Sequence, residues 1–328
     1  MEPAGHINRP NLFLVAFGLA CGLLPPQLAA NAETRGESKG AVVIDLPKHS
    51  IGSLERIIDG DDYSDEHSPG TTFSELSGRV AVAPNTILGV TIRDSLSDPI
   101  PVFARIPANL VQSITLTGLA NFDERTVKSI LRFKNLKRLQ LDRAELDDKG
   151  LGMLAALPNL ESIVASHTQI KGTTLPSLCI LKKLSRLDIG SNELKGESLT
   201  ALTCLKHLDN LSIGRCHLRN PHLSFLTELP QLTHLELSDN NLLSDPCLKY
   251  ISRLKNLTNI KIDGTHISPK ATLLLKGAPL RFLKVSPNFY SPSEKAMVQK
   301  AFPRVKVKVN DKQSRNFGIF KELFEKDK

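Results

Sequence analysis

The sequence predicts an α/β fold, a repeat solenoid with a parallel β-sheet on its concave face and helical or 3₁₀ segments on its convex face. Three observations predict it. One apolar pattern recurs about every 24 residues, leucine recurs at every third residue between successive copies, and tryptophan is absent while aromatic residues make up only 5% of the chain. A core almost without rings favours thin, regularly stacked layers of aliphatic side chains over an irregular globule.

The first half of each repeat predicts a short strand. It reads apolar, two variable, apolar, one variable, apolar, and its six clearest copies keep a spacing of 24 or 25 residues. Those copies begin at Leu136, Leu160, Leu184, Leu208, Leu232 and Leu257. Weaker copies bring the expected number of units to about ten, and they begin at Ile87, Val111, Leu280 and Phe302. Since side chains alternate along a strand, the third, fifth and seventh residues of each copy should face away from the core.

The second half of each repeat predicts a helix or a 3₁₀-helix. Leucine at every third residue gives such a segment one apolar face. Four consecutive units show this spacing, as Leu151, Leu154 and Leu157; Leu175, Leu178 and Leu181; Leu199, Leu202 and Leu205; and Leu223, Leu226 and Leu229. Asn220-Pro221 places a capping residue before a proline at the first helical position, and Asp245-Pro246 does the same. Each unit is therefore a strand, a turn and a helical return.

The motifs LKRLQLDRAEL, LSRLDIGSNEL, LDNLSIGRCHL, LTHLELSDNNL and LTNIKIDGTHI resemble the leucine-rich repeat family in its roughly 24-residue form. The resemblance covers residues 87–309 and implies a leucine-rich repeat solenoid, with repeats like those of exported bacterial proteins. In the family, the ninth motif residue is usually Asn or Cys, whose side chain bonds backbone groups of the turn. Here the ninth residues are Ala144, Thr168, Asn192, Cys216, Asn240 and Thr265. We call the recurring bonds from this side chain to the turn backbone the asparagine ladder. Because alanine has no hydrogen-bonding side chain, we expect this ladder to be weak at Ala144.

The N-terminus predicts a secretory signal peptide over residues 1–32. An uncharged apolar run at residues 12–24 is followed by two prolines, and residues 30–32 (Ala-Asn-Ala) supply the small side chains that precede a cleavage site. Two alternatives stay open. One is a buried N-terminal helix; the other is a lipoprotein signal at Cys21, which is less favoured because Gly18 stands where such signals usually carry Leu. Either signal predicts an exported protein, whether periplasmic, at the cell surface or secreted.

Residues 33–78 differ in character from the repeats. They hold four bases and ten acids, which predicts an acidic, partly disordered lead-in. An acidic run at residues 59–66 suggests a calcium loop. The EF-hand pattern fails there, because Ser64 stands at the glycine position and Gly70 at the position of the bidentate glutamate.

Residues 79–310 are expected to form the solenoid, and both of its ends need a cap. At the N-terminal end, a hairpin over residues 79–87 with its turn at Pro84-Asn85 should fill this role. At the C-terminal end, residues 311–328 form a basic amphipathic cap or tail, with phenylalanines at helical spacing. A membrane-binding helix is the alternative interpretation of this tail.

Four cysteines remain after the signal, and their spacing contains no CxxC pair and no zinc pattern. Cys216 falls in a turn, and Cys179, Cys204 and Cys247 fall in helical halves beside leucines. We interpret the four as small buried thiols. Cys179 and Cys204 lie in adjacent units, so a disulfide between them is the alternative.

No motif for catalysis is present in the sequence. It has no GxxxxGK(S/T) phosphate loop, no HExxH zinc pair and no GxSxG nucleophile elbow, and no two histidines have ligand spacing. We therefore predict a non-enzymatic protein with no metal and no other cofactor.

The variable strand residues form the candidate binding surface, on the concave face. We predict ligand contacts from Arg138, Gln140, Asp142, Arg186, Asp188, His234, Glu236, Asn259, Lys261, Lys284 and Lys306. Simple solvation is the alternative role of each of these side chains. The predicted partner is a protein, a peptide or a glycan. Nucleic acid is not expected, because the protein should be exported and because aromatic residues are nearly absent from the strands.

A second function class uses the basic C-terminal end. Residues 253–328 carry 17 bases and six acids, which suits a structural protein associated with a polyanion or with a membrane surface. Membrane contact is expected only through this basic tail or through lipidation at Cys21. Salt should weaken polyanion contacts steeply and leave a neutral protein interface intact.

Overall fold

The computed structural model describes residues 41–48, 50, 52–57, 71–83, 86–92, 96, 98–119, 122–286 and 291–309. The chain divides into two units, Met1–Lys39 and Gly40–Lys328, and all described residues belong to the second. The predicted signal peptide, Cys21, the acidic run at residues 59–66 and the tail 311–328 lie outside the described residues.

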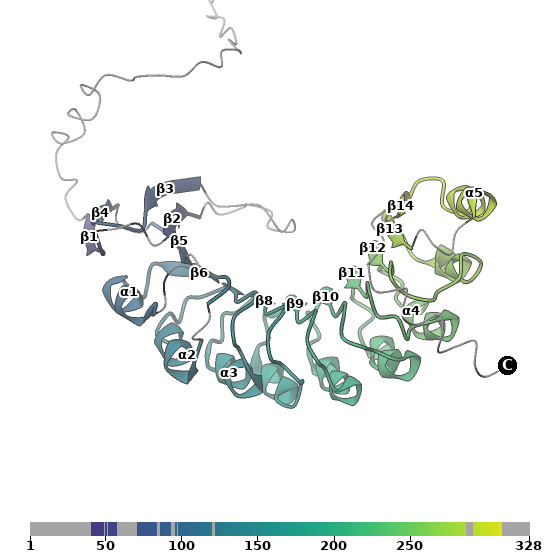
Figure 1. Cartoon of the computed structure of the whole chain (residues 1–328), viewed down its shortest axis with the longest axis horizontal. Coiled ribbons are helices and arrows are strands. Elements are labelled where there is room, and N and C mark those ends of the chain that lie inside the picture. Colours follow the sequence, from purple (N-terminus) through teal and green to yellow (C-terminus); the bar gives the residue numbers. More distant parts are fainter. Residues whose placement is uncertain are drawn as a thin grey trace, which may run out of the picture. The chain divides into compact units, whose positions relative to one another are not determined.

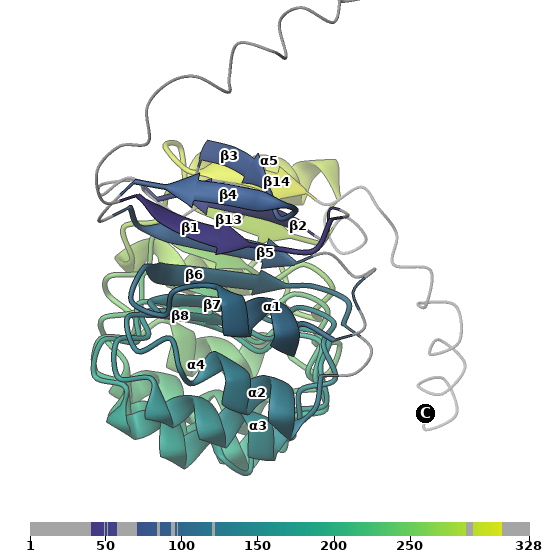
Figure 2. The same ribbon diagram turned by 90° about the vertical axis from the view of Figure 1, so that its left-hand side faces the viewer.

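One sheet of 12 strands runs through the described residues, in the order β14-β13-β12-β11-β10-β9-β8-β7-β6-β5-β2-β3. Its strands from β5 to β14 all run parallel. They are β5 (Leu88–Ile92), β6 (Val111–Leu116), β7 (Arg138–Gln140), β8 (Ser162–Val164), β9 (Arg186–Asp188), β10 (Asn210–Ser212), β11 (His234–Glu236), β12 (Asn259–Lys261), β13 (Phe282–Val285) and β14 (Lys306–Val309). The strands line the inner side of a curved stack, and the helical segments lie on its outer side (Figure 1 and Figure 2).

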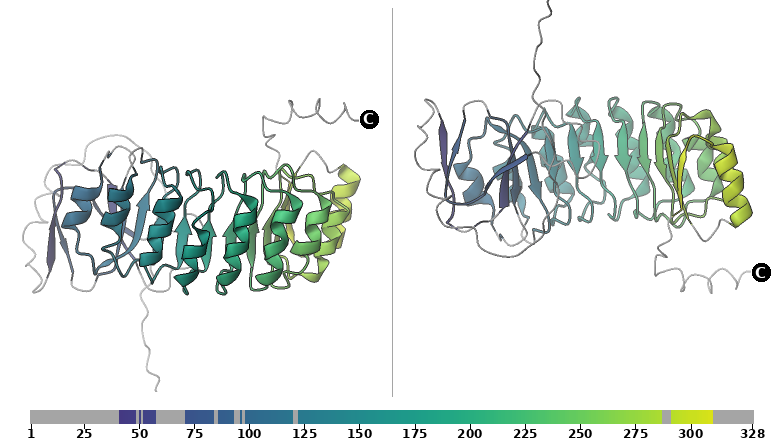
Figure 3. Two further views of the ribbon diagram at one scale, coloured as in Figure 1. Left: turned by 90° about the horizontal axis from the view of Figure 1, so that it is seen from below. Right: turned by 90° about the horizontal axis from the view of Figure 1, so that it is seen from above.

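Short helices connect the parallel strands on the convex side (Figure 3). They are α1 (Ile100–Arg105), α2 (Glu124–Ile130), α3 (Asp148–Met153), η2 (Leu154–Ala156), η3 (Leu175–Ile180), η4 (Gly196–Cys204), η5 (Asn220–Glu228), η6 (Asp245–Cys247), α4 (Leu248–Ile251), η7 (Ala271–Gly277) and α5 (Pro292–Ala301), where η denotes a 3₁₀-helix. In η3, Leu175 and Leu178 are fully buried. The predicted fold class is thereby confirmed: an α/β leucine-rich repeat solenoid with a parallel concave sheet and a convex layer of helical and 3₁₀ segments.

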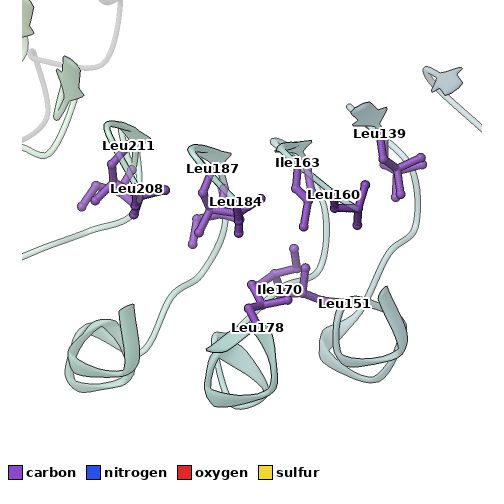
Figure 4. Close-up of a cluster of buried hydrophobic side chains, with 14 of the residues drawn as sticks. Leu139, Leu151, Leu160, Ile163, Ile170, Leu178, Leu184, Leu187, Leu208 and Leu211 are labelled. Atoms are coloured by element: carbon purple, nitrogen blue, oxygen red, sulfur yellow. The ribbon is translucent and has the colours of Figure 1, made fainter. Parts of the chain in front are cut away.

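Strand register follows the repeat period. Leu139 on β7 pairs with Ile163 on β8, which pairs with Leu187 on β9, and Leu187 pairs with Leu211 on β10, so that each step is 24 residues. Figure 4 shows these four side chains projecting from their strands toward the helical side. A single unit would leave its leucines exposed to water, so stacking of neighbouring units supplies the core.

The ninth motif residue bonds the turns of neighbouring units, as the family resemblance implies. The side-chain amide of Asn192 donates to the carbonyl oxygens of Ala165 and Ile189 at 2.9 and 3.0 Å, and its Oδ1 accepts from backbone N–H groups of the preceding turn. Asn240 repeats this arrangement two units later, with two carbonyl bonds of 2.9 Å. Ala144 has no side-chain polar atom, so this ladder has no rung there.

The N-terminal cap pairs differently from the prediction. β4 (Arg79–Val82) is antiparallel to β1 (Val42–Asp45), whereas the sequence predicted a hairpin over residues 79–87 that leads into the first repeat. That prediction is wrong, because an alternating apolar pattern fixes which face of a strand is buried and does not identify its partner. Ile44 and Val80 are register partners, and both are buried.

Strands also occur within the acidic lead-in. β2 (Gly52–Arg56) lies antiparallel between β5 and β3 (Thr71–Glu75), and the two strands extend the sheet beyond the first repeat (Figure 2). The lead-in over residues 33–78, for which partial disorder was expected, thus contains the strands β1, β2 and β3. Leu54 and Leu76 are fully buried. These buried leucines belong to the core, which the net negative charge of the segment did not indicate.

The last repeat begins two residues later than predicted. Lys306 on β14 pairs with Phe282 on β13, which places the start of the tenth copy at residue 304 instead of Phe302. This start restores the 24-residue spacing from residue 280. A shift of two residues leaves every side chain on the same face of the sheet, and the apolar pattern favours the earlier frame, because Phe302 is apolar whereas residue 304 is Arg.

A disulfide joins Cys179 of η3 to Cys204 of η4, with Cα atoms 5.5 Å apart. The interpretation of these two cysteines as free buried thiols is therefore wrong, since adjacent convex segments bring them together. Cys216 and Cys247 are free and buried, as predicted. Burial raises the pKa of both thiols to about 12. They stay protonated at neutral pH and are poor nucleophiles.

Candidate functional site

A groove of about 900 Å³ lies on the concave side, across strands β9 to β13. Seven of the eleven predicted residues line it, namely Arg186, Asp188, His234, Glu236, Asn259, Lys261 and Lys284. The other four lie outside its lining, on or after β7 and on β14, and they are Arg138, Gln140, Asp142 and Lys306. The structure therefore brings together the predicted residues of the central and later repeats and leaves the others apart.

Strand register arranges the lining side chains in columns. Arg186, Asn210 and His234 are successive partners on β9, β10 and β11, and Asn259 follows on β12. All four are half-buried, since each is the third residue of its motif and faces away from the leucine core. A ligand that lies across the strands would meet one residue of this column about every 4.8 Å.

Ion pairs neutralise the later part of the groove. Lys261 Nζ lies 2.9 Å from Glu236 Oε2, and Lys284 Nζ lies 3.1 Å from Asp263 Oδ2. Asp263 is only 2% exposed and also accepts a hydrogen bond of 2.6 Å from Ser238 Oγ. Each lysine reaches a carboxylate of the preceding unit, so these charges are already satisfied by one another.

Two glycines form part of the groove floor. Gly190 and Gly214 occupy the seventh motif position in adjacent units, and both line the groove. A Cβ at Gly214 would lie 3.0 Å from the carbonyl oxygen of Ser238, and a Cβ at Gly190 would lie 3.2 Å from that of Gly214. Neighbouring units approach one another closely here, and glycine avoids the tight contact that a Cβ would make with the next unit.

His167, Arg215 and Asp239 are rim residues of the groove that sequence reasoning missed. Each is the eighth residue of its motif and has a left-handed backbone, with φ of 54°, 56° and 59°. The same conformation recurs at this position in four other units, at Gly118, Arg143, Ser191 and Gly264. Glycine marks such a turn most clearly, whereas Asp and His are only enriched at positive φ, so the units without glycine gave a weaker signal. Across the rim, Arg215 Nε lies 2.9 Å from Asp239 Oδ2.

His234 lies half-buried near the centre of the groove. Burial lowers the pKa of its imidazole, the carboxylate of Asp209 opposes this shift, and the positive charges of Arg186 and Lys261 lower the pKa further. Burial raises the pKa of Asp209. His234 Nδ1 lies 2.8 Å from Thr233 Oγ1. The imidazole is therefore mostly neutral at pH 7, where one ring nitrogen donates a hydrogen bond and the other accepts one.

The groove offers a ligand hydrogen bonds and charges from five consecutive strands. Within the described residues, no group of three or more His, Cys, Asp and Glu side chains could hold a metal ion. In the same part of the chain, no helix combines the length and the apolar character that crossing a bilayer requires.

The parallel strands, the convex 3₁₀-helices and the asparagine ladder define a leucine-rich repeat solenoid. No protein-family model and no curated protein matches the sequence. Among solved structures, the chain is similar to an internalin (InlF) from Listeria monocytogenes, with 19% sequence identity and a TM-score of 0.48. The alignment covers 67% of this chain and 66% of the internalin, so this chain spans just under two thirds of that protein.

Proposed function

We propose that this is an exported, non-enzymatic protein that binds a protein or a peptide through its concave face. The observation that carries the proposal is the groove, which collects polar side chains from β9 to β13 in a regular array. Solenoids of this kind use their curvature to present extended concave binding surfaces. A glycan fits less well, because Phe282 is the only Phe, Tyr or Trp among the described residues that line the groove.

Two features support export. Residues 1–32 have the layout of a signal peptide, and disulfides such as Cys179–Cys204 persist mainly in oxidising compartments. Sequencing the N-terminus of the protein recovered from outside the cytoplasm should find a chain that begins at Glu33. Recovery of only the full-length chain, in the cytoplasm, would contradict export.

Photo-crosslinking of the full chain tests the binding face. A photoreactive amino acid replaces Ser212, which lines the groove, and in a parallel variant it replaces Ser224, which is exposed on η5 at the convex side. We expect one partner to be captured from Ser212 and not from Ser224, and we expect the double variant Arg186→Ala/Glu236→Ala to lose this capture. Capture from Ser224 alone, or a catalytic turnover that the double variant abolishes, would contradict the proposal.

A further inference from the structure

Arg186 differs from the other cations of the groove, because it has no partner within the described part of the chain. Lys261, Lys284 and Arg215 each pair with a carboxylate. The guanidinium of Arg186 makes no hydrogen bond or ion pair with a described residue, and its Nε atom is buried. Buried polar atoms are nearly always paired, so an unpaired guanidinium on β9, at one end of the groove, points to a ligand that supplies its partner.

Two polar side chains extend the column next to Arg186. Asn210 is its register partner on β10, and His234 follows on β11. The Asn210 side chain likewise has no partner among the described residues. His234 uses Nδ1 toward Thr233 at 2.8 Å, which leaves Nε2 as its second hydrogen-bonding atom. A planar guanidinium fork beside an amide and an imidazole provides the donors that a carboxylate requires.

A second group of unpaired cations lies on β14, at the C-terminal end of the same face. Lys306 and Lys308 are exposed, and neither forms an ion pair with a described residue. Lys306 continues the column of Arg186, because its register partner is Phe282 on β13. Five strand steps of about 4.8 Å separate β9 from β14, which amounts to roughly 24 Å.

The distance between the two cationic positions corresponds to a short peptide. An extended chain rises about 3.3 Å per residue, so about seven or eight residues cover that distance. Between the two positions, Glu236 and Asp263 carry charges that Lys261 and Lys284 already neutralise. The face therefore has two separate positive ends that are joined by a neutral, polar middle.

We infer that the partner carries an acidic, extended peptide segment of about seven or eight residues, which lies across strands β9 to β14. One of its carboxylates binds the guanidinium of Arg186 beside Asn210 and His234, and acidic residues near its other end meet Lys306 and Lys308. This inference rests on the proposed function and deepens it by naming the chemistry of the partner.

Other anionic partners fit this face less well. A nucleic acid or a sulfated glycan carries charge along its whole length. The cations between the two positive ends, Lys261, Lys284 and Arg215, already pair with carboxylates of this chain, so such a polymer would find no matching charge along the middle of the face. Nucleic-acid bases also stack on aromatic side chains, and Phe282 is the sole Phe, Tyr or Trp of the described lining. A peptide can place carboxylates at its ends and neutral residues between them.

Selection of displayed random octapeptides against the full chain tests the inference. We expect the enriched peptides to carry Asp or Glu near one end and further acidic residues near the other. The affinity of one enriched peptide is then measured by fluorescence anisotropy against the wild type, Arg186→Gln, Arg186→Lys and Arg253→Gln. Arg253 follows α4 on the convex side and is exposed. Its substitution is the matched control for loss of one positive charge.

We expect Arg186→Gln to weaken binding about tenfold or more, because it removes a charge-assisted pair of hydrogen bonds. Arg186→Lys should weaken binding less, since lysine keeps the charge and loses the planar fork. Arg253→Gln should bind as the wild type does. Replacing the peptide carboxylate that contacts Arg186 by its amide should weaken binding to the wild type as much as Arg186→Gln does. The same replacement should weaken binding to the Arg186→Gln variant only a little further.

The double variant Lys306→Gln/Lys308→Gln should show the same coupling with the acidic residues at the other end of the peptide. All of these variants should melt at the wild-type temperature, because the substituted side chains have no ion-pair partner in the described fold. A binding loss without a change in melting temperature thus separates a ligand contact from a folding defect.

Three outcomes would overturn the inference and not the proposed function. The first is enrichment of peptides without acidic residues, and the second is no enrichment at all. The third is that the affinity losses from Arg186→Gln and from the peptide substitution are additive. In each case a partner crosslinked from Ser212 would still support binding at the concave face. Failure of that crosslinking experiment would remove the proposed function itself.

Discussion

The convex layer of the solenoid is built in two ways. At the N-terminal end it consists of α-helices α1 and α2, whose units pack through Phe103 and Phe133, with ring centroids 5.5 Å apart and ring planes at 77°. In the centre it consists of the 3₁₀-helices η3, η4 and η5, which bury mainly leucines, with Phe225 of η5 as one buried ring.

The spacing of apolar residues explains this difference. A 3₁₀-helix has three residues per turn, so Leu199 and Leu202 of η4 lie along one face, and both are fully buried. Helix α2 instead buries Thr126, Val127 and Ile130, at the spacing of three and four residues that an α-helix places on one side. In α2 and η4 the apolar spacing thus matches the type of helix, whereas α4 is α-helical although its buried Leu248 and Ile251 are three residues apart.

The turns after the strands separate the same two regions. In the centre, the buried side chains of Asn192 and Asn240 bridge neighbouring turns. In the N-terminal region, Ala144 occupies the corresponding position and provides no bridge. We infer that ring packing stabilises the first units and that side-chain hydrogen bonds and a disulfide stabilise the central ones.

The largest effect is expected from Phe133→Ala, in the N-terminal region. The side chain is fully buried and packs edge-on against Phe103. Its removal should lower the free energy of unfolding by about 4 kcal/mol, because it leaves a cavity and removes the ring contact. Equilibrium urea unfolding followed by circular dichroism measures the change. A loss no larger than that of Phe133→Leu would mean that the rings are not essential to this region.

A slightly smaller effect is expected from Asn240→Ala, in the centre. The substitution leaves the carbonyl oxygens of Ile213 and Leu237 without their side-chain partner, and it should cost about 3 kcal/mol in the free energy of unfolding. Asn256→Ala is the control, since Asn256 is exposed and donates one side-chain bond, of 3.0 Å, to Pro230. Equal losses of unfolding free energy in the two variants would show that the buried asparagine contributes no more to stability than an exposed one.

The disulfide should contribute about 2 kcal/mol to the centre. It closes a sequence separation of 25 residues, and loop closure of that size restricts the unfolded chain. We expect the double variant Cys179→Ala/Cys204→Ala to unfold at lower urea than the oxidised wild type. A reducing agent should bring the wild type to the same midpoint and leave the double variant unchanged. A wild type that is insensitive to reduction would argue against any contribution of the bond.

The smallest effect should be common to both regions, because they share one turn conformation. Arg143 and Ser191 have φ of 59° and 53°, a conformation that glycine adopts without the cost that a Cβ imposes. At each position the glycine variant should be more stable than the alanine variant by about 1 kcal/mol. Thermal unfolding of the four single variants measures this. A difference at one position only would show that the turns are not equivalent.

The repeat period predicted most of the fold because residues one period apart pack against each other in adjacent units. Leu139 and Ile163 occupy the same site one layer apart, so 24 residues of sequence correspond to one strand step in space. Pairing between unlike segments leaves no such record. β4 finds its partner in β1, across the segment that contains β2 and β3, and nothing in its alternating pattern identifies that strand.

The placement of the site residues could be predicted better than their partners. Alternation along the strands indicates that Arg186 and Glu236 face away from the core. It does not reveal that Lys261 neutralises Glu236 while Arg186 has no described partner, because both facts depend on side-chain reach between units. Placing the rim residue Asp239 required knowledge of a left-handed turn, which an aspartate indicates less clearly than a glycine does.

The disulfide also sets how the molecule would respond to tension. A solenoid that is pulled from its two ends should unravel layer by layer, because each repeat contacts only its neighbours. Cys179 and Cys204 are 25 residues apart, and a stretched chain of that length measures about 85 Å. In the oxidised protein, the disulfide prevents the segment between the two cysteines from extending. A reduced molecule would therefore extend further under the same load, and the middle of the stack would act as a redox-dependent limit on its stretch.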